Sequence, residues 1–542
     1  MTIATRPPSF AIACLHHRLL TIAFLGTSAM QPPAEVDVLV IGAGTAGSVV
    51  AARLSEDPSR RVCLLEAGDW PTDPDVANPA MWPLLQGRPY DWAYETVPQA
   101  GTAGRVHAWP RGRMMGGSSG LNAMAHVRGH PDDFDAWAAV AGPRWSHAGL
   151  LPGFLRSERF SGGASEAHGG DGPFDVTLPS DEVSPLVRAY MAAGEALGAP
   201  KLGDHNLGPL CGTAPNSLNI ARGRRVTLAD AYLAGLSERA NLTIVTGARV
   251  DRLAVAGGRI GPVTVRLADG TTFTIRAATV VLSTGAVASP LMLMRSGIGD
   301  PDDLARFGIA CTVPLPAVGQ NLHDHLLIAG NVYRAHRPIP ATKLQHSESL
   351  MYLHSDDLSR ADGSPDVVLG CVVVPAVSEC FERPVAGTAY TLLAGACHPT
   401  SRGSIRLSGP NPDDAPIIDP AYLATEADRA GFRAALRTAR AVGHAEPLDA
   451  WREAELLPGP ETDDDAALDA FIARAVITHH HPVGTCSMGR DERAVVDADL
   501  RVRGLDNLFV VDAAVIPKLT AGPVNAAVVA IAETFAEYFP RL

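Results

Sequence analysis

The strongest hydrophobic pattern lies near the start of the chain, where a mostly apolar run, VDVLVI (36–41), meets the glycine-rich stretch GAGTAG (42–47). The small and apolar residues of SVVAARL (48–54) follow at helical spacing, and RRVCLL (60–65) is a second apolar run. Continuous apolar strands joined by a helix are typical of a parallel sheet that is covered on both faces. Residues 36–65 are therefore predicted to form a strand–helix–strand unit.

The remaining apolar patterns predict a mixture of helices, hairpins and buried strands, and therefore an α/β (α+β) fold. Residues 70–175 are an exception, because they are rich in Gly, Pro and Trp and show little periodicity, which predicts long ordered loops. The predicted helices cover 183–197, 426–444 and 524–539, and the predicted strands lie in 241–255, 262–286 (with a hairpin turn at Asp269-Gly270), 366–397 and 507–517.

Length and charge narrow the classes of protein that the chain can belong to. With 542 residues it is too long for one simple core, and two large lobes are expected. The net charge of −13 is not offset by a Lys/Arg cluster, which makes nucleic acid and anionic membranes poor partners. No apolar run reaches the roughly 18 residues of a membrane span, so no stable span is expected.

Cysteine usage and the first residues bear on location. The eight cysteines contain no CxxC pair, which indicates reduced thiols in a cytoplasmic protein. Residues 1–34 are predicted to be an N-terminal extension. RLLTIAFLGTSAM (18–30) loosely fits a secretory signal, but its apolar run is short. The favoured alternative is that the start codon was assigned too early and that the fold begins near Met30.

The glycine stretch has the spacing of a dinucleotide-binding turn. Gly42, Gly44 and Gly47 fit GxGxxG between a strand and a helix, and Glu66 ends the next strand. Such glycines allow a tight turn, a close approach to pyrophosphate and close helix packing, while the acidic residue binds a ribose hydroxyl. The carboxylate disfavours a 2′-phosphate, so FAD or NAD is expected. The alternative is a glycine turn without a ligand.

A second stretch of small residues, RGRMMGGSSGLNAMAHVRG (111–129), also allows backbone to approach a flat ligand closely. A flexible linker is the alternative, but the interleaved Met and Leu residues argue against it.

Several motifs together resemble the glucose–methanol–choline family of FAD-dependent oxidoreductases. GRMMGGSSGLNAM (112–124) and GAVASPLMLMRSGIG (285–299) are similar to its two signatures, although Met115 departs from the usual Leu or Val. VGQNLHDH, HPVGTCSMG and NLFVVDAAVIP follow in family order, and the resemblance runs from about residue 35 to the C-terminus. It implies an FAD-binding lobe over 35–175, 215–330 and 485–542, and a substrate-binding lobe with an antiparallel sheet over 176–214 and 331–484.

The resemblance also assigns cofactor residues. Some members tether FAD through a histidine in the first signature, where this chain has Leu121, so the FAD is expected to be non-covalent. The residues implied to hold it are Gly42, Gly44, Thr45, Ala46, Gly47, Glu66, Ala67, Gly116, Gly117, Ser118, Asn122, Ala123, Met124, Val250, Asp512, Ala513 and Val524.

The run THHHPVG (478–484) contains the candidate catalytic base. His481 precedes a proline, which favours extended backbone, so His479 and His481 are expected to share a face and His480 to point away. Metal binding by this pair needs a third ligand that the sequence does not supply, and no metal is predicted. A structural role is another alternative. His323 and His325 of NLHDH are another candidate metal pair, but the resemblance implies that this stretch is an ordered structural loop near the flavin. His481 matches the family's catalytic histidine, and imidazole suits proton abstraction at neutral pH.

The family's second catalytic position is usually His or Asn, but here Pro523 occupies it, or Asn525 if a small gap is allowed. Family members that oxidise pyridoxine also combine a proline here with an HxHP arrangement, so His479 is a candidate to hold the substrate hydroxyl. The resemblance therefore implies oxidation of a primary alcohol to an aldehyde, with an aromatic alcohol such as pyridoxine first and choline or another polar alcohol second. A hydroxynitrile-lyase-like or photodecarboxylase-like activity is a further alternative. Oxygen or a quinone-type acceptor would reoxidise the flavin, and the oligomeric state is left open.

Overall fold

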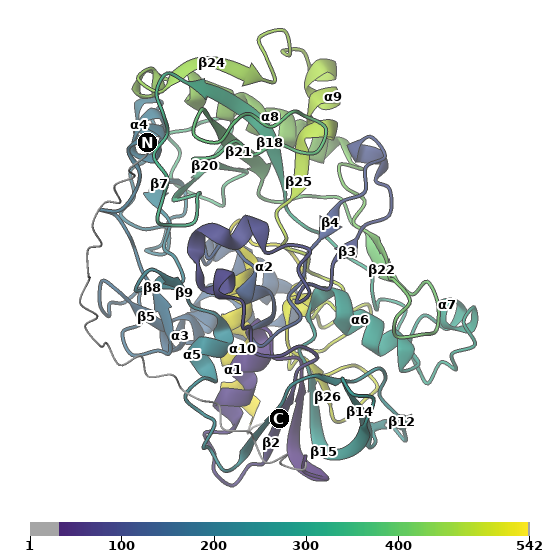
Figure 1. Cartoon of the computed structure of the whole chain (residues 1–542). Coiled ribbons are helices and arrows are strands. Elements are labelled where there is room, and N and C mark those ends of the chain that lie inside the picture. The colour runs from purple at the N-terminus through teal and green to yellow at the C-terminus, as the bar shows by residue number, and fades with distance from the viewer. Residues whose placement is uncertain (1–31, 540–542) are drawn as a thin grey trace, which may run out of the picture. The chain divides into compact units, whose positions relative to one another are not determined.

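The computed structural model describes residues 32–539 of the chain. Most of the predicted N-terminal extension therefore lies outside the described residues. The described part contains two large sheets, one near each end of the view in Figure 1, with helices packed against them.

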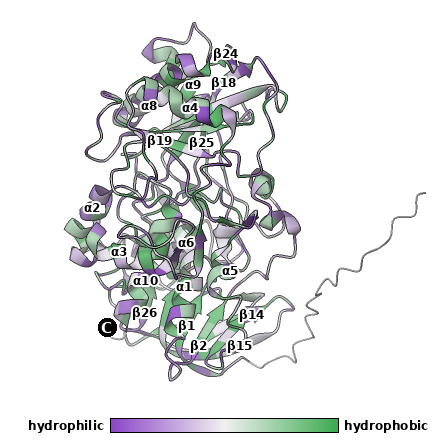
Figure 2. Ribbon diagram, turned by 90° about the vertical axis from the view of Figure 1, so that its left-hand side faces the viewer, coloured by the Kyte–Doolittle hydropathy of each residue, from purple (hydrophilic) through white to green (hydrophobic). Residues whose placement is uncertain are grey.

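The first sheet has seven strands and contains the predicted strand–helix–strand unit. Five strands run parallel, in the order β10, β2, β1, β15 and β26, and β14 joins β15 as the predicted antiparallel hairpin. Figure 2 shows these strands mostly in the colour of apolar residues, as expected for a sheet covered on both faces. Its strands are β1 (Glu35–Ile41), β2 (Val62–Leu65), β10 (Leu242–Val245), β11 (Ala248–Arg249), β14 (Val263–Leu267), β15 (Thr272–Leu282) and β26 (Leu508–Val510).

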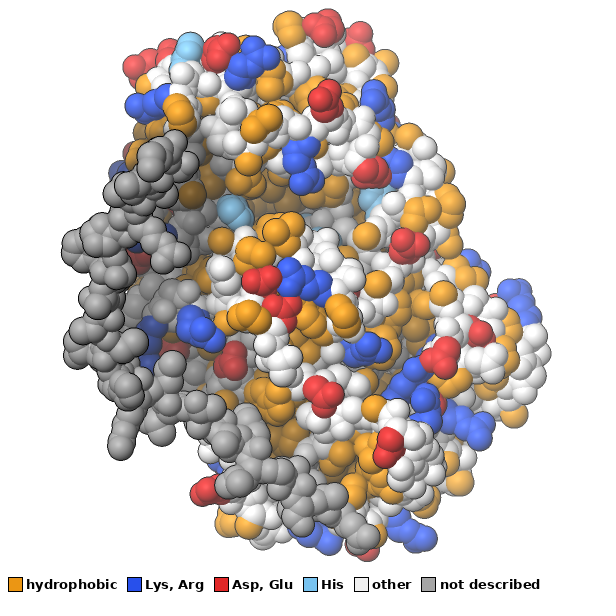
Figure 3. Space-filling view, in the orientation of Figure 1, with side chains coloured by type: hydrophobic (Ala, Val, Ile, Leu, Met, Phe, Trp, Pro, Cys, Tyr) orange, Lys and Arg blue, Asp and Glu red, His pale blue; other side chains and the backbone are white. Residues whose placement is uncertain are grey.

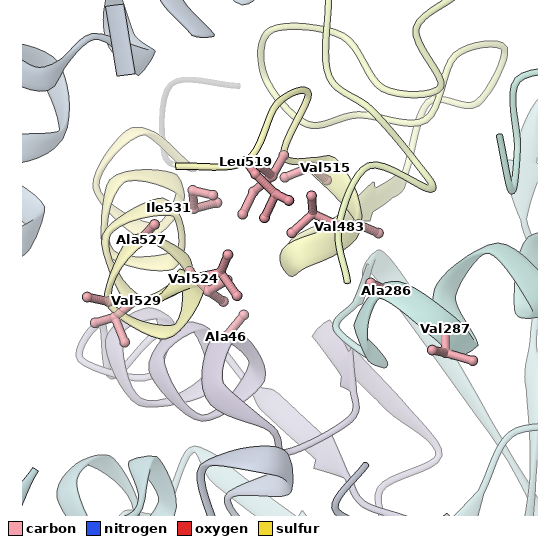
Figure 4. Close-up of a cluster of buried hydrophobic side chains, with 14 of the residues drawn as sticks. Ala46, Ala286, Val287, Val483, Val515, Leu519, Val524, Ala527, Val529 and Ile531 are labelled. Atoms are coloured by element: carbon pink, nitrogen blue, oxygen red, sulfur yellow. The ribbon is translucent and has the colours of Figure 1, made fainter. Parts of the chain in front are cut away.

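Two helices fix the turn at the end of β1. Helix α1 (Thr45–Leu54) connects β1 to β2, and α10 (Val524–Tyr538) packs along it. Nearly every residue of α10 up to Phe535 is buried, and Figure 4 shows Ala46 of α1 close to Val524 of α10. The small side chains of α1 let the two helices approach closely. The first turns of both helices lie at the same end of the sheet.

The second sheet is antiparallel and also has seven strands. Helix α8 (Glu426–His444), with the predicted bounds, packs against β18, β20 and β21. The strand β25 ends directly before the three histidines and pairs with the start of β18, which follows the NLHDH motif. The strands are β7 (Gly212–Pro215), β18 (Leu326–Ala335), β19 (Ser349–Leu353), β20 (Val367–Val372), β21 (Ala389–Ala396), β24 (Arg452–Leu457) and β25 (Val476–Thr478).

The prediction of long loops over 70–175 was partly wrong. Two helices, α2 (Pro131–Ala141) and α3 (His147–Ser157), lie in this region. Helix α2 begins with a histidine cap: the His130 side chain accepts from the Asp132 backbone, and Asp133 accepts from the His130 backbone. Its apolar residues Phe134 and Trp137 are fully buried. Tertiary packing therefore stabilises a helix whose sequence lacks a Ser or Thr start signal.

The other elements are shorter, apart from α4, α6 and α9. The predicted strand over 507–517 is confirmed only as β26, since the chain turns into a 3-10 helix at Ala513–Val515. The remaining helices are α4 (Pro185–Ala196), α5 (Leu228–Tyr232), α6 (Gly285–Arg295), α7 (Pro301–Ala305) and α9 (Asp465–Ala475). The short strand pairs are β3 (Tyr94–Glu95) with β4 (Ala108–Trp109), β5 (Glu158–Phe160) with β6 (Phe174–Val176), β8 (Ile220–Ala221) with β9 (Arg224–Arg225), β12 (Val255–Ala256) with β13 (Arg259–Ile260), β16 (Ile298–Gly299) with β17 (Val313–Pro314), and β22 (Ser404–Arg406) with β23 (Ile417–Asp419).

The surface and the helices give two further observations. On the face shown in Figure 3, acidic and basic side chains are interspersed. Among the described residues, no helix has both the length and the apolar character needed to cross a membrane.

Candidate active site

A single cavity of about 860 Å³ joins the glycine-rich turns to the histidine run. It opens beyond the carboxyl ends of β1 and β2, where ligands bind in open α/β sheets. The first turns of α1, α6 and α10 border it, and so do residues of the second sheet. Its volume lies in the upper part of the range for cofactor and small-molecule sites, so a ligand with several rings can fit.

The two glycine-rich stretches pack directly against each other. A Cβ added to Gly117 would lie 2.7 Å from the Gly44 Cα, and one added to Gly47 would lie 1.8 Å from the Gly42 oxygen. Gly117 also has φ +52°, a conformation that L side chains rarely adopt. Larger residues would therefore separate the turns and distort the cavity where backbone lines it.

Glu66 lies at the end of β2, as predicted, and lines the cavity. Its carboxylate accepts hydrogen bonds from the backbone N–H groups of Ala43 (2.8 Å) and Gly68 (2.9 Å). Burial raises the pKa of Glu66 to about 7, and those hydrogen bonds oppose the rise. The carboxylate is thus fixed beside the first glycine turn, with oxygen lone pairs left to accept from a ribose hydroxyl.

The orientation of the Asn122 amide is set by its neighbours. Its Oδ1 accepts from the Arg225 guanidinium at 2.7 Å and from the Met124 backbone at 3.1 Å. The Nδ2 group is consequently the end of the amide that is left to donate to a ligand in the cavity, which Asn122 lines.

Asn525 is oriented in a similar way from the opposite helix. Thr45 Oγ1 donates to Asn525 Oδ1 at 2.8 Å, and the Asn525 Nδ2 atom is buried without a hydrogen-bond partner. A buried amide donor without a partner is costly, so this atom indicates a ligand group beside it. The neighbouring Pro523 also lines the cavity but offers no side-chain hydrogen bond.

Asp512 holds the start of α6 in place. Its carboxylate accepts from the Gly285 backbone (2.8 Å), from the Ser289 hydroxyl (2.5 Å) and from the Ala514 backbone (2.8 Å). Burial raises the pKa of Asp512, and these donors counteract the rise. The role of Asp512 is therefore to fix two backbone segments that line the cavity.

The rings of His479 and His481 lie side by side, as predicted, with centroids 4.2 Å apart. The backbone is less regular than expected. His480 has φ +66°, its N–H donates to Thr478 Oγ1, and His480 lines the cavity as well. The side-chain bond at Thr478 bends the chain out of the strand, so simple alternation does not explain the pairing.

Desolvation favours the neutral form of the three histidines. It lowers the pKa of His480 to about 3, and it lowers the pKa values of His479 and His481 well below the usual 6.5, with neighbouring imidazoles adding to the effect. A neutral imidazole has a free lone pair, so each ring can accept a proton from a ligand.

Asp324 holds the backbone of the histidine run. Its carboxylate accepts from the His481 N–H (2.6 Å), from Thr478 Oγ1 (2.6 Å) and from the Tyr422 hydroxyl (2.5 Å). Burial raises the pKa of Asp324, and the hydrogen bonds oppose this. The carboxylate thus positions the backbone at His481, and these three hydrogen bonds do not involve the His481 ring.

His325 is the functional neighbour that sequence reasoning missed. It was interpreted as part of a structural loop, but its Nδ1 lies 3.0 Å from His481 Nδ1. In the described chain, nitrogens of His325, His479 and His481 lie within 4.8 Å of one another, so the structure supplies the third metal-ligand candidate that the sequence lacked. The signal was the HDH spacing before β18, whose pairing with β25 places His325 opposite His479.

Most of the sequence-predicted site residues line this one cavity. Gly47 and Gly116 are not among the lining residues; Gly47 packs against the glycine turn. The predicted residues that line it are Gly42, Gly44, Thr45, Ala46, Glu66, Ala67, Gly117, Ser118, Asn122, Ala123, Met124, Val250, His479, His481, Asp512, Ala513, Pro523, Val524 and Asn525.

The second sheet gives the cavity an aliphatic wall next to the histidines. It contains one aliphatic residue from each of the strands β18, β19, β20, β21 and β25: Leu327, Leu350, Val368, Leu393 and Ile477. We call these five residues the aliphatic wall. None of them carries a charge or an aromatic ring, so the wall offers dispersion contacts to a flat apolar group.

The fold and this site can be compared with known proteins. A family model described as GMC oxidoreductase matches residues 36–327, more than half of the chain, and a second model with the same description matches residues 399–532. The chain is a GMC oxidoreductase. The resemblance predicted from the motifs is confirmed, and so is the α/β fold class.

Individual relatives agree with the family. The chain is 53% identical over 508 residues to pyridoxine 4-oxidase of Microbacterium luteolum, covering 93% of this chain and 100% of that one. It is 36% identical to an oxygen-dependent choline dehydrogenase of Escherichia coli, covering 93% and 94% of the two chains. The crystal structure of pyridoxine 4-oxidase from Mesorbium loti superposes with a TM-score of 0.92 at 55% identity, covering 94% and 99%.

This GMC oxidoreductase is an FAD-dependent enzyme that acts on alcohols, as members of its family do. The site fits the cofactor. The glycine turns leave backbone exposed where a pyrophosphate needs close approach, and Glu66 stands at the ribose position of such turns. Asn122 and the partnerless Asn525 Nδ2 offer donors for a polar flat ring further along.

Proposed function

We propose that the enzyme oxidises an aromatic primary alcohol, such as pyridoxine, to the aldehyde. The observation that carries the proposal is the pair of neutral imidazoles, His479 and His481, at the edge of the aliphatic wall. The wall would hold the substrate ring and the imidazoles would meet its hydroxyl. The pyridoxine 4-oxidases named above, which are 53% and 55% identical to the chain, support this substrate class.

His481 would remove the hydroxyl proton, and bound FAD supplies the acceptor for the hydride that leaves carbon. A neutral imidazole is the required form of a base, and the lowered pKa of His481 keeps it neutral over a wide pH range. His479 would donate to or accept from the same oxygen and hold it. Pro523, which also lines the cavity, has no side-chain group that would compete for that oxygen.

The FAD would be bound non-covalently. Leu121 occupies the position of the tethering histidine found in some family members, and its side chain has no nucleophilic atom. Acid precipitation should release the flavin into the supernatant, and flavin retained in the pellet would contradict this part. The reduced flavin would pass its electrons to oxygen or to a quinone-type acceptor. The cytoplasmic location of the enzyme also stays a prediction.

Choline is the second candidate substrate, because choline dehydrogenases are also relatives of the chain, one of them at 36% identity. The aliphatic wall itself has none of the aromatic faces or carboxylates that recognise quaternary ammonium groups, whereas other segments that line the same cavity carry Trp82, Trp92 and Glu95. Anaerobic mixing in the dark with pyridoxine, benzyl alcohol, 5-hydroxymethylfurfural or choline tests the choice. Rapid bleaching of the flavin by pyridoxine supports the proposal, bleaching by choline alone favours the second candidate, and a flavin that stays oxidised with all four favours a lyase or photodecarboxylase activity.

A further inference from the structure

The side chain of His325 contacts two groups, and together they define its tautomer. Its Nε2 lies 2.8 Å from the carbonyl oxygen of Cys397, and its Nδ1 lies 3.0 Å from His481 Nδ1. A carbonyl oxygen only accepts hydrogen bonds, so the proton of His325 is on Nε2. Burial lowers the pKa of His325 to about 4, so a second proton on Nδ1 is disfavoured at neutral pH.

The tautomer of His481 follows from that of its neighbour. With its proton on Nε2, His325 presents a lone pair at Nδ1, and a hydrogen bond at 3.0 Å requires a proton on the facing His481 Nδ1. A neutral imidazole carries one proton, so His481 Nε2 has the lone pair. His481 lines the cavity, and Nε2 is the nitrogen that this bond leaves available to a ligand.

We propose that His325 is a positioning residue that fixes His481 in the Nδ1–H tautomer, so that Nε2 is the atom that takes the substrate proton. This inference rests on the proposed role of His481 as general base. The orienting group is an imidazole, because the nearby Asp324 carboxylate is occupied by backbone and hydroxyl donors. Once His481 is protonated at Nε2, its Nδ1–H remains bonded to His325, which spreads the new charge over both rings.

A neutral orienting partner differs in its effect from the carboxylate that orients histidine in many hydrolases. A carboxylate would raise the pKa of the base by stabilising the imidazolium. His325 instead leaves the pKa of His481 low, so that the base is already neutral when the substrate binds. The contact with His325 therefore orients the His481 ring without making it more basic.

The direct test is nitrogen NMR of the oxidised holoenzyme with 15N-labelled histidine, with His481 identified by comparison with the His481→Gln spectrum. We expect a protonated Nδ1 and an unprotonated Nε2 on His481. His325→Asn keeps an acceptor near the Nδ1 position and should preserve this tautomer. His325→Leu removes the acceptor and should shift the proton of His481 towards Nε2.

Anaerobic flavin reduction by pyridoxine gives the second measurement on the same proteins at equal FAD content. His325→Leu should slow reduction by at least about 10-fold, and by up to about 10⁴-fold if the wrong tautomer dominates, as in a serine protease that loses its orienting carboxylate. His325→Asn should stay within about 3-fold of wild type.

Three results would overturn the inference: a wild-type His481 protonated at Nε2, a His325→Leu enzyme with unchanged tautomer and rate, or a transition metal bound stoichiometrically by His325, His479 and His481 in the purified holoenzyme. The NMR result judges the tautomer whether or not His481 is the base. If His481→Ala is reduced at the wild-type rate, the proposed function fails separately from this inference.

Discussion

Thr45 Oγ1 donates a hydrogen bond to Asn525 Oδ1 at 2.8 Å, which joins the first turn of α1 to the first turn of α10. The bond commits the oxygen of the Asn525 amide and leaves its Nδ2 buried without a partner. Because Thr45 belongs to the glycine-rich turn, this contact places Asn525 beside the cofactor-binding segment. Asn525 was predicted as an alternative contact for the substrate hydroxyl, and its bond to Thr45 favours a role in holding FAD.

Asn525→Ala should therefore weaken FAD binding more than it slows the reaction. Losing one amide hydrogen bond costs about 1 kcal/mol, which corresponds to roughly a 5- to 10-fold higher dissociation constant for FAD. Flavin fluorescence titration of the apoenzyme measures this constant, and Thr45→Val serves as a matched variant that frees the Asn525 oxygen. A loss of flavin reduction of about 100-fold at saturating FAD, with unchanged FAD affinity, would instead place Asn525 on the substrate.

His479→Ala should slow flavin reduction by pyridoxine more than His480→Ala does. The His479 ring lies against the His481 ring with centroids 4.2 Å apart, whereas His480 sits at a backbone turn with φ +66° and, in the described part of the chain, stacks on neither ring. Two hydrogen-bonding groups on one hydroxyl orient its carbon, so losing His479 should lower the rate as well as the affinity. Pro523→Asn should partly rescue His479→Ala by supplying a new polar group. Stopped-flow reduction of the three variants decides this, and a fully active His479→Ala enzyme would rule the role out.

The buried neutral histidines should make the folded enzyme sensitive to acid. Burial lowers the pKa of His323 to about 3 and the pKa of His126 to about 4, whereas an unfolded chain takes up protons near pH 6.5. The free energy of unfolding should therefore be steady above about pH 6.5 and fall as the pH drops towards 4, because the unfolded state then binds more protons. Each such group contributes about 1.4 kcal/mol per pH unit in that window.

Urea unfolding at several pH values, with saturating FAD, measures this slope. His323→Gln should lower the slope of the unfolding free energy against pH by up to about 1.4 kcal/mol per pH unit. Replacement of the exposed His336 by Gln should leave this slope unchanged. A slope that is flat between pH 6.5 and 4.5 would show that the buried histidines do not remain neutral in the fold.

Local patterns predicted the elements whose signals lie within one segment. The β1–α1–β2 unit and α8 were found because their apolar periodicity is complete over short windows, and both formed as expected. Helix α2 was missed although Pro131 and the acidic Asp132 and Asp133 in its first turn are start signals, because its cap is a histidine side chain and the Gly- and Pro-rich sequence around it shows little periodicity.

The candidate site was predicted less completely, because its geometry depends on long-range contacts. Most of the residues that the family motifs supplied line the cavity, but they are a minority of its lining. The bond between His325 and His481 joins residues 156 positions apart, and that between Thr45 and Asn525 joins residues 480 apart. Motif spacing within a sequence does not predict contacts between residues so far apart. They arise only when β18 pairs with β25 and α1 packs on α10.

The rate of flavin reduction in His481→Ala, mixed anaerobically with pyridoxine and compared with wild type at equal FAD content, tests the central proposal most directly. His481 supplies the proton acceptor in this account, and a general base contributes about 10²- to 10⁴-fold. We predict a fall of that size with FAD still bound. Reduction at the wild-type rate would show that another group removes the proton and would contradict the account.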